Sequence, residues 1–285
     1  MSAHPFAEPH FVDRSNVQAN ADGDRLRDGR QPVGAPVKNP VPDALEGVPA
    51  LNSWVMSPVR SCLDRTVAGL VLLILAPVLL GLILVVRMSS PGPSLFRQRR
   101  AGRNREDFIL YKFRSMRGDH PEGPAITVSG DRRITRVGAF LRRYKLDELP
   151  QFWNVLKGNM SLVGPRPKLP HHEGLDLPYR PGITGMATLA FREEEKVLAE
   201  IPREQLDAFY EICIKPRKAE LDLEYMRNAT LGSDLKLLWR TGASCLFGPD
   251  ELSLEESERL RMLVAAWLDL HQDRAEPVPS EVGVG

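Results

Sequence analysis

Two adjacent acidic residues, Asp147 and Glu148, stand at the start of an apolar helical pattern, directly after the basic residues Arg142, Arg143 and Lys145. Free N–H groups in the first turn of a helix attract anions, and a carboxylate can act as a nucleophile. The stretch could therefore hold a phosphate group beside a carboxylate that attacks it. The alternative is structural, because an aspartate at this position often only caps the helix.

The element that must position this pair is the helix that follows. Its apolar residues recur at helical spacing and predict one buried face: Leu149, Phe152, Trp153 and Leu156. Pro150 fits only in a first turn, so we expect the helix to begin near Asp147 and to end at Gly158.

Length and composition allow one good-sized domain with appendages, since 42% of the 285 residues are hydrophobic and the net charge is +1. The three cysteines form no C-x-x-C pair, which excludes a disulfide framework and a common zinc motif and favours a reducing compartment. Residues 1–52 are rich in proline and glycine and lack an apolar period, so we expect a disordered arm there.

Residues 67–86 carry no polar side chain, and a straight helix of this length would just cross a hydrocarbon core of about 30 Å. Membrane association follows, whereas the topology has two interpretations. Pro77 interrupts the run, and basic residues flank both of its ends, which favours a re-entrant helix-break-helix hairpin over residues 53–88. A single span with a proline kink is the alternative.

A basic stretch over residues 95–117 follows the membrane segment and is typical of a surface that faces lipid headgroups. Within it, residues 108–116 form the pattern of a short strand. Side chains alternate along a strand, so Lys112 and Arg114 lie on the same side and could grip a diphosphate. A basic patch that contacts lipid is the alternative.

Helical patterns account for much of the remaining chain. Residues 131–145 predict a helix whose buried stripe includes Phe140 and Leu141, and residues 204–239 are helical throughout. A capping box, Ser253 with Glu256, predicts the start of an amphipathic helix within residues 249–274. The acidic run Glu193 to Glu195 is typical of a solvated face, and residues 275–285 predict a disordered tail.

With these blocks in view, the chain resembles the bacterial sugar transferases, specifically the small monotopic phosphoglycosyl transferases that start glycan assembly on a lipid carrier. The resemblance covers residues 58–247. It rests on the proline-broken apolar segment and on these ordered motifs: Phe96-Arg97-Gln98, Lys112 to Met116, Leu146 to Gln151, Asn154 to Gly158, Met160 to Pro167 and Arg180 to Gly185.

The resemblance implies an α+β, mostly helical fold: a re-entrant membrane hairpin joined to a compact catalytic domain, residues 89–248, with a small sheet. It implies transfer of a sugar phosphate from a nucleoside diphosphate sugar, expected to be a UDP-sugar, to polyprenyl phosphate, with release of a nucleoside monophosphate. The expected location is the cytosolic face of the bacterial inner membrane. Membrane lipids and a possible homodimer are further expected partners, and no nucleic acid is expected.

The resemblance also assigns roles to particular residues. Asp147 would form an aspartyl phosphosugar intermediate, and Glu148 would bind the cofactor Mg²⁺. Substrate binding falls to five basic residues: Lys112, Arg114, Arg142, Arg166 and Arg192. The run that follows Gly185 departs from the common family pattern, which leaves the sugar open. A non-catalytic membrane adaptor that binds anionic lipid and protein partners is the rival hypothesis.

Overall fold

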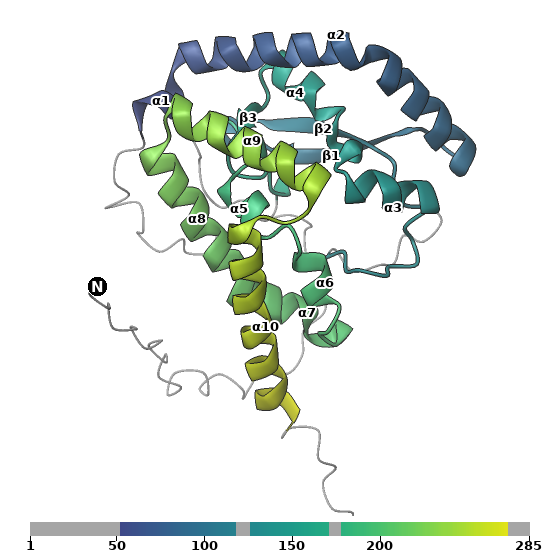
Figure 1. Cartoon of the computed structure of the whole chain (residues 1–285), viewed down its shortest axis with the longest axis vertical. Coiled ribbons are helices and arrows are strands. Elements are labelled where there is room, and N and C mark those ends of the chain that lie inside the picture. Colours follow the sequence, from purple (N-terminus) through teal and green to yellow (C-terminus); the bar gives the residue numbers. More distant parts are fainter. Residues whose placement is uncertain (1–51, 118–125, 171–177, 273–285) are drawn as a thin grey trace, which may run out of the picture. The chain divides into compact units, whose positions relative to one another are not determined.

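A computed structural model describes residues 52–117, 126–170 and 178–272. Nearly all of the predicted N-terminal arm and the whole predicted tail lie outside these ranges. The described chain is mostly helical, with two small sheets and one long apolar helix (Figure 1). These features agree with the predicted α+β class.

The long apolar helix is α2, Pro58–Ser89, which follows the short helix α1, Ser53–Met56. Ser57 caps it by accepting a hydrogen bond from the Val59 amide, and Pro58 occupies the first turn, where it needs no N–H partner. By length and composition, α2 is the one described helix that could cross a membrane. Most of its apolar side chains are exposed to the surroundings of the protein.

The predicted helix-break-helix over residues 53–88 is not present as two helices, because α2 continues through Pro77. The later part of α2 instead bends toward α3, Arg136–Arg143 (Figure 1). A proline inside a helix removes one hydrogen bond and clashes with the preceding turn, and this local defect can bend a helix without ending it.

The polar N-terminal part of α2 is anchored in the domain by a buried network around Arg60. Its guanidinium group donates to Asp234 Oδ2 at 2.9 Å, to the Val163 carbonyl at 2.8 Å and to the Tyr225 hydroxyl at 2.9 Å. The Trp54 indole N–H donates to the same Asp234 oxygen at 2.9 Å. These contacts tie the start of α2 to α8, Lys215–Asn228, and α9, Leu231–Phe247.

The C-terminal end of α2 is also packed on the domain. Val86 is fully buried with Phe113 and Leu141. The apolar stretch between the two anchored ends leaves large side chains exposed, such as Leu73, Ile74 and Leu80. Both ends of α2 therefore contact the same domain.

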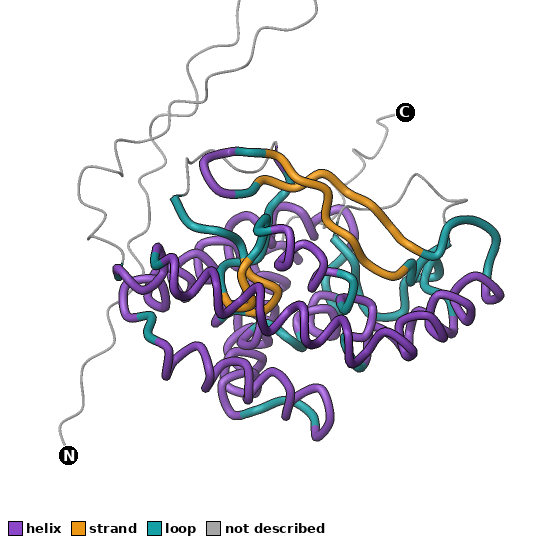
Figure 2. Tube along the Cα trace, turned by 90° about the horizontal axis from the view of Figure 1, so that it is seen from above, coloured by secondary structure: helices purple, strands orange, loops and turns teal. Residues whose placement is uncertain are grey.

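The first sheet is an antiparallel hairpin of β1, Leu95–Ala101, and β2, Asp107–Phe113, in which Leu95 pairs with Phe113 (Figure 2). Its turn contains a 3₁₀ segment, η1, Arg103–Arg105. The helix α4, Gln151–Lys157, packs against both β2 and α2. Phe108 and Leu110 of β2 share a core cluster with Val155 of α4.

The second sheet pairs β3, Ser161–Val163, with β4, Gly182–Thr184, in parallel. Close approach requires glycine here, because a Cβ atom on Gly182 would lie 2.1 Å from the Gly164 nitrogen. The Gly182 amide donates to the Pro165 carbonyl at 2.9 Å, and the Gly164 amide donates to the Thr184 carbonyl at 2.8 Å. These bonds fix the loop that carries Arg166.

The remaining helices form a second packed region. It contains α5, Met186–Ala190; α6, Glu194–Leu198; α7, Arg203–Phe209; the π turn η4, Tyr210–Ile214; α8; and α10, Glu251–Gln272. Leu260 and Val264 of α10 are buried in this core, as expected for the predicted amphipathic helix. The predicted capping box is wrong, because Asp250 accepts from the Ser253 amide and Glu256 pairs with Arg217.

Two predicted inward positions are also wrong. Trp153 is 50% exposed and Phe140 is 56% exposed. In α4, the buried positions instead include Asn154 and Val155. The helix lies between β2 and α2 and buries two polar residues, Gln151 and Asn154, and one apolar residue, Val155, where spacing alone predicted an aromatic residue.

Candidate active site

Asp147 and Glu148 lie on a short 3₁₀ turn, η2, Leu146–Glu148, which precedes α4. Lys145 enters this turn with a left-handed backbone, φ 55°. A non-glycine residue in this conformation costs energy, and such strain tends to accumulate at functional sites. Helix α4 begins only at Gln151, with Pro150 at its N-cap position, so Asp147 does not cap it.

Glu148 is held by two cations. Lys112 Nζ contacts Glu148 Oε1 at 3.1 Å, and Arg166 Nη2 contacts the same oxygen at 2.6 Å. Burial opposes ionisation of this carboxyl group, but Arg166 and Lys112 outweigh that effect and hold its pKa well below the ordinary value. Glu148 is therefore a stable anion at neutral pH.

The pKa of Asp147 is shifted in the opposite direction. It is 5% exposed, and its Oδ1 has no hydrogen-bond partner among the described residues. Burial raises the pKa of Asp147, and the adjacent Glu148 charge raises it further, against the attraction of Lys112. The two neighbouring carboxyl groups thus differ in their surroundings. Glu148 is fixed by ion pairs, and Asp147 has no direct partner in the described part of the chain.

Lys112 projects from β2 toward this pair. Burial lowers its pKa to about 8, although the Glu148 charge acts in the other direction. For Arg166 the attraction of the Glu148 charge outweighs the effect of burial, so the pKa of Arg166 is raised. The structure therefore brings together four of the predicted site residues: Asp147, Glu148, Lys112 and Arg166.

Arg142 lies at the edge of this group, whereas the contacts of Arg192 are with other residues. Arg142, in the last turn of α3, acts on the charge of Asp147 and forms an ion pair with Glu195 of α6. The solvated face predicted for the acidic run is only partly present, because the Glu193 and Glu194 side chains are 18% and 24% exposed and Glu195 is 38% exposed. Arg192 donates to the Arg143 carbonyl at 3.3 Å and lies 3.6 Å from Cys245 Sγ.

Arg114 is not brought to the site. Strand β2 ends at Phe113, and the Arg114 guanidinium group donates to the carbonyls of Ser90 at 2.6 Å, Pro93 at 2.7 Å and Val86 at 3.2 Å. The expected diphosphate grip by Lys112 together with Arg114 is therefore wrong. The alternation of side chains places Lys112 and Arg114 on the same side only if the strand includes both residues. Strand β2 ends one residue before Arg114.

Sequence reasoning missed Asn154 as a positioning residue. Its side chain is fully buried, accepts from the Tyr111 amide at 3.1 Å and donates to the Ile109 carbonyl at 2.7 Å. These bonds fix α4 against the edge of β2, next to Lys112. The signal in the sequence that could have identified Asn154 was an amide side chain within an apolar helical pattern, because a buried polar group needs hydrogen-bond partners.

The carboxyl pair also fits a divalent cation. Glu148 Oε2 has only a 3.5 Å contact with Arg166, so it retains acceptor capacity, and Asp147 Oδ1 is unpartnered. Magnesium is usually held by one or two carboxylates together with substrate phosphates. Among the described residues, no larger cluster of metal-ligating side chains is present.

Taken together, these groups can bind a phosphate and present a carboxylate to it. A sequence profile described as bacterial sugar transferase matches residues 55–248, which is more than half of the chain. The chain belongs to this family. The match includes α2, both sheets and every residue of the group around Asp147.

Three relatives illustrate the match. The chain is 38% identical over 213 residues to a UDP-glucose:undecaprenyl-phosphate glucose-1-phosphate transferase of Xanthomonas campestris pv. campestris, covering 70% of this chain and 41% of the relative. It is 38% identical over 199 residues to a protein of the same name from Caulobacter vibrioides, covering 66% and 69%. It is 32% identical over 213 residues to an Aeromonas hydrophila UDP-N-acetylgalactosamine-undecaprenyl-phosphate N-acetylgalactosaminephosphotransferase, covering 70% and 47%. The match thus spans less than half of the Xanthomonas and Aeromonas proteins.

The position of Arg114 generates a stability prediction. Arg114→Ala removes three charge-assisted hydrogen bonds that join β2 to the end of α2, so we expect the free energy of unfolding to fall by about 2 kcal/mol. Thermal unfolding of the detergent-solubilised chain measures this loss. The matched control is Arg99→Ala, at an exposed position on β1. Equal melting temperatures for the two variants would contradict the anchoring role.

Proposed function

We propose that the chain transfers a sugar phosphate from a nucleoside diphosphate sugar to polyprenyl phosphate. The observation that carries the proposal is the buried, unpartnered Asp147 carboxyl oxygen beside Glu148, which Lys112 and Arg166 hold in place. Family membership supports the reaction class. The relatives named above act on UDP-linked sugars and undecaprenyl phosphate according to their names.

The proposed chemistry has two displacements at phosphorus. The Asp147 carboxylate attacks the sugar-linked phosphate, a new P–O bond forms, and the bond to the nucleoside monophosphate breaks with the electron pair leaving on that product. An oxygen of polyprenyl phosphate then attacks the aspartyl phosphosugar and restores the free carboxylate. A covalent intermediate of this kind lets two bulky substrates react in turn.

The basic residues have distinct proposed roles. Lys112 and Arg166 place positive charge where the phosphate oxygens would lie, and Arg142 adds charge from α3. Phosphoryl transfer depends mainly on alignment and charge stabilisation. Arg192 bonds to the carbonyl of Arg143, the residue after Arg142, and its proposed contact is with the substrate beyond the phosphates.

Magnesium is the proposed cofactor. Glu148 would hold it through Oε2, with Asp147 as the adjacent oxygen donor, which fits the acceptor capacity of these two groups. When bound, the metal would polarise phosphate oxygens and neutralise developing charge. The chain's own residues supply the remaining functions, since Lys112 and Arg166 orient the carboxyl pair.

For the membrane segment we propose a re-entrant topology, with the catalytic domain on the cytosolic face of the bacterial inner membrane. The support is that Arg60 near the start of α2 and Val86 near its end both pack on the same domain. A helix that crossed a core of about 30 Å would place these ends on opposite sides. The bend in α2 shortens its reach (Figure 1).

A membrane adaptor without turnover is the competing proposal. It explains the exposed apolar surface of α2 and the basic surface, but it gives no reason for a buried carboxyl group without a partner. Leaving such a group unpartnered costs stability. A homodimer stays a prediction on either proposal.

The first prediction for this function concerns the nucleophile. Asp147→Asn should abolish release of the nucleoside monophosphate, because an amide cannot form the aspartyl phosphosugar. The assay incubates detergent-solubilised protein with Mg²⁺, polyprenyl phosphate and a panel of UDP-sugars. Mass spectrometry of acid-quenched wild-type protein, without the acceptor, should find the sugar phosphate on the peptide that contains Asp147.

The matched control is Asp250→Asn, which makes the same change at an aspartate that pairs with Arg240 away from this group. It should retain turnover. Full turnover by Asp147→Asn would exclude the nucleophile assignment. Lipid binding without turnover of any sugar in the panel by the wild-type chain would favour the adaptor.

The second prediction is a bell-shaped dependence of kcat/KM on pH. Asp147 must be ionised to attack, and its raised pKa moves the acid limb above the range of an ordinary aspartate. Lys112 must be charged, and its pKa of about 8 places the basic limb there, since kcat/KM reports the free enzyme. Lys112→Arg should keep activity and shift the basic limb to higher pH. An unchanged basic limb in that variant would exclude Lys112 as its origin.

The third prediction tests topology by cysteine labelling. Cys62 is exposed, so all three native cysteines are first replaced with serine. Ser53→Cys and Pro91→Cys then place one thiol before and one after α2, both at exposed positions. A membrane-impermeant maleimide applied to inside-out vesicles should label both thiols. Labelling of the two thiols from opposite faces would establish a span.

A further inference from the structure

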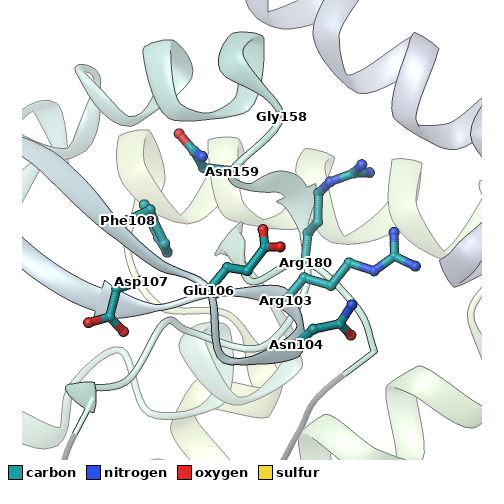
Figure 3. Close-up of a pocket in the computed structure, with 9 residues that line it drawn as sticks. Arg103, Asn104, Glu106, Asp107, Phe108, Gly158, Asn159 and Arg180 are labelled. Carbon is teal, nitrogen blue, oxygen red and sulfur yellow. The ribbon is translucent and has the colours of Figure 1, made fainter.

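A second polar cavity lies away from the carboxyl pair, at the turn between β1 and β2. Its volume is about 260 Å³, and Arg103, Glu106 and Arg180 are among the residues that line it (Figure 3). The cavity-lining residue of β2 nearest to Lys112 is Phe108, which lies four residues before it. At about 3.3 Å per residue, that separation is roughly 13 Å. The cavity is thus separate from the site around Asp147.

Three arginine side chains gather at this cavity without a carboxylate partner. Arg103 and Arg180 line it, and Arg65 of α2 lies against Gly158, which also lines it. Within the described ranges, none of the three forms an ion pair, and Arg103 Nε is buried without a hydrogen-bond partner. Burial lowers the pKa of Arg180, and the nearby charges of Arg65 and Arg103 lower it further, against the attraction of Asp64. Mutual repulsion among the three guanidinium groups therefore favours the binding of an anion here.

The same cavity carries groups suited to hydroxyls. Figure 3 shows the Glu106 side chain reaching into the space between Asn159 and Arg180, with Asn104 at the turn. Asn104 has a left-handed backbone, φ 53°, a conformation that asparagine tolerates better than most residues. A carboxylate accepts hydrogen bonds from hydroxyl groups, and an amide can both donate and accept them.

We propose that this cavity binds a polyol phosphate, with Arg103 and Arg180 on the phosphate and Glu106 and the asparagine amides on the hydroxyls. The position of the cavity along α2 also suits a lipid headgroup. Arg180 donates to Ser61, and Arg65 precedes the apolar run of α2, so the cavity lies at the polar end of the membrane helix. The ligand is either the headgroup of phosphatidylglycerol or a soluble polyol phosphate, and this assignment does not depend on the reaction proposed above.

The test measures the melting temperature of the full chain in neutral detergent micelles. The probes are dioleoylphosphatidylglycerol mixed into the micelles, dioleoylphosphatidylcholine as the zwitterionic comparison, and glycerol 1-phosphate in solution. Binding to the folded state should raise Tm by about 3 °C at ten times Kd. A rise with phosphatidylglycerol alone identifies the lipid, and a rise with glycerol 1-phosphate identifies a soluble ligand.

Three variants separate this cavity from other basic surfaces. Arg103→Ala should abolish the rise without lowering the unliganded Tm, because it breaks no ion pair among the described residues and removes one of the mutually repelling charges. Arg259→Ala is the matched control on the exposed surface of α10 and should keep the rise. Lys112→Ala should also keep it. The proposal is overturned if neither probe raises Tm, if Arg103→Ala keeps the full rise, or if only Lys112→Ala loses it.

Discussion

The arrangement depends on the attachment of one apolar helix at both of its ends. Arg60 joins the start of α2 to Asp234, Tyr225 and the Val163 carbonyl, while Val86 near its end is buried against Phe113 and Leu141. A buried guanidinium group is tolerated only when it is paired and hydrogen-bonded. The anchor at Arg60 therefore favours one geometry, and the exposed apolar side chains between the anchors must be covered by something other than this domain.

This attachment also fixes the site, because α4 lies between α2 and β2. Leu156 of α4 lies next to Gly69 of α2, and Asn154 bonds to the backbone of β2. The turn that carries Asp147 and Glu148 enters α4 directly. The distance between the carboxyl pair and Lys112 is thus set by packing that begins at the apolar helix α2, which connects the placement of that helix to the alignment of the site.

Much of this arrangement could be predicted where the spacing of apolar residues alone determines which side of an element is buried. The apolar run of α2, the helices beyond residue 203 and the buried Leu260 side of α10 are of this kind. Trp153 and Arg114 could not be placed, because the burial of one depends on what α4 packs against and the direction of the other depends on where β2 ends. The order of the motifs was enough to predict a role for Asp147. That one of its carboxyl oxygens lacks a hydrogen-bond partner within the described ranges could be seen only in the structure.

The charges around Asp147 place a condition on any substrate. Lys112, Arg166 and Arg142 face three carboxyl groups, those of Glu148, Glu195 and Asp147. Lys145 adds one further positive charge, so the site carries only a small positive excess when Asp147 is ionised. A nucleoside diphosphate sugar adds about two negative charges, and a buried anion needs compensation. Arg142 could supply part of it by leaving Glu195, whose side chain is 38% exposed and can be hydrated. A divalent cation at the carboxyl pair would add positive charge at the same place, so the magnesium proposal and the covalent proposal depend on the same two carboxyl groups.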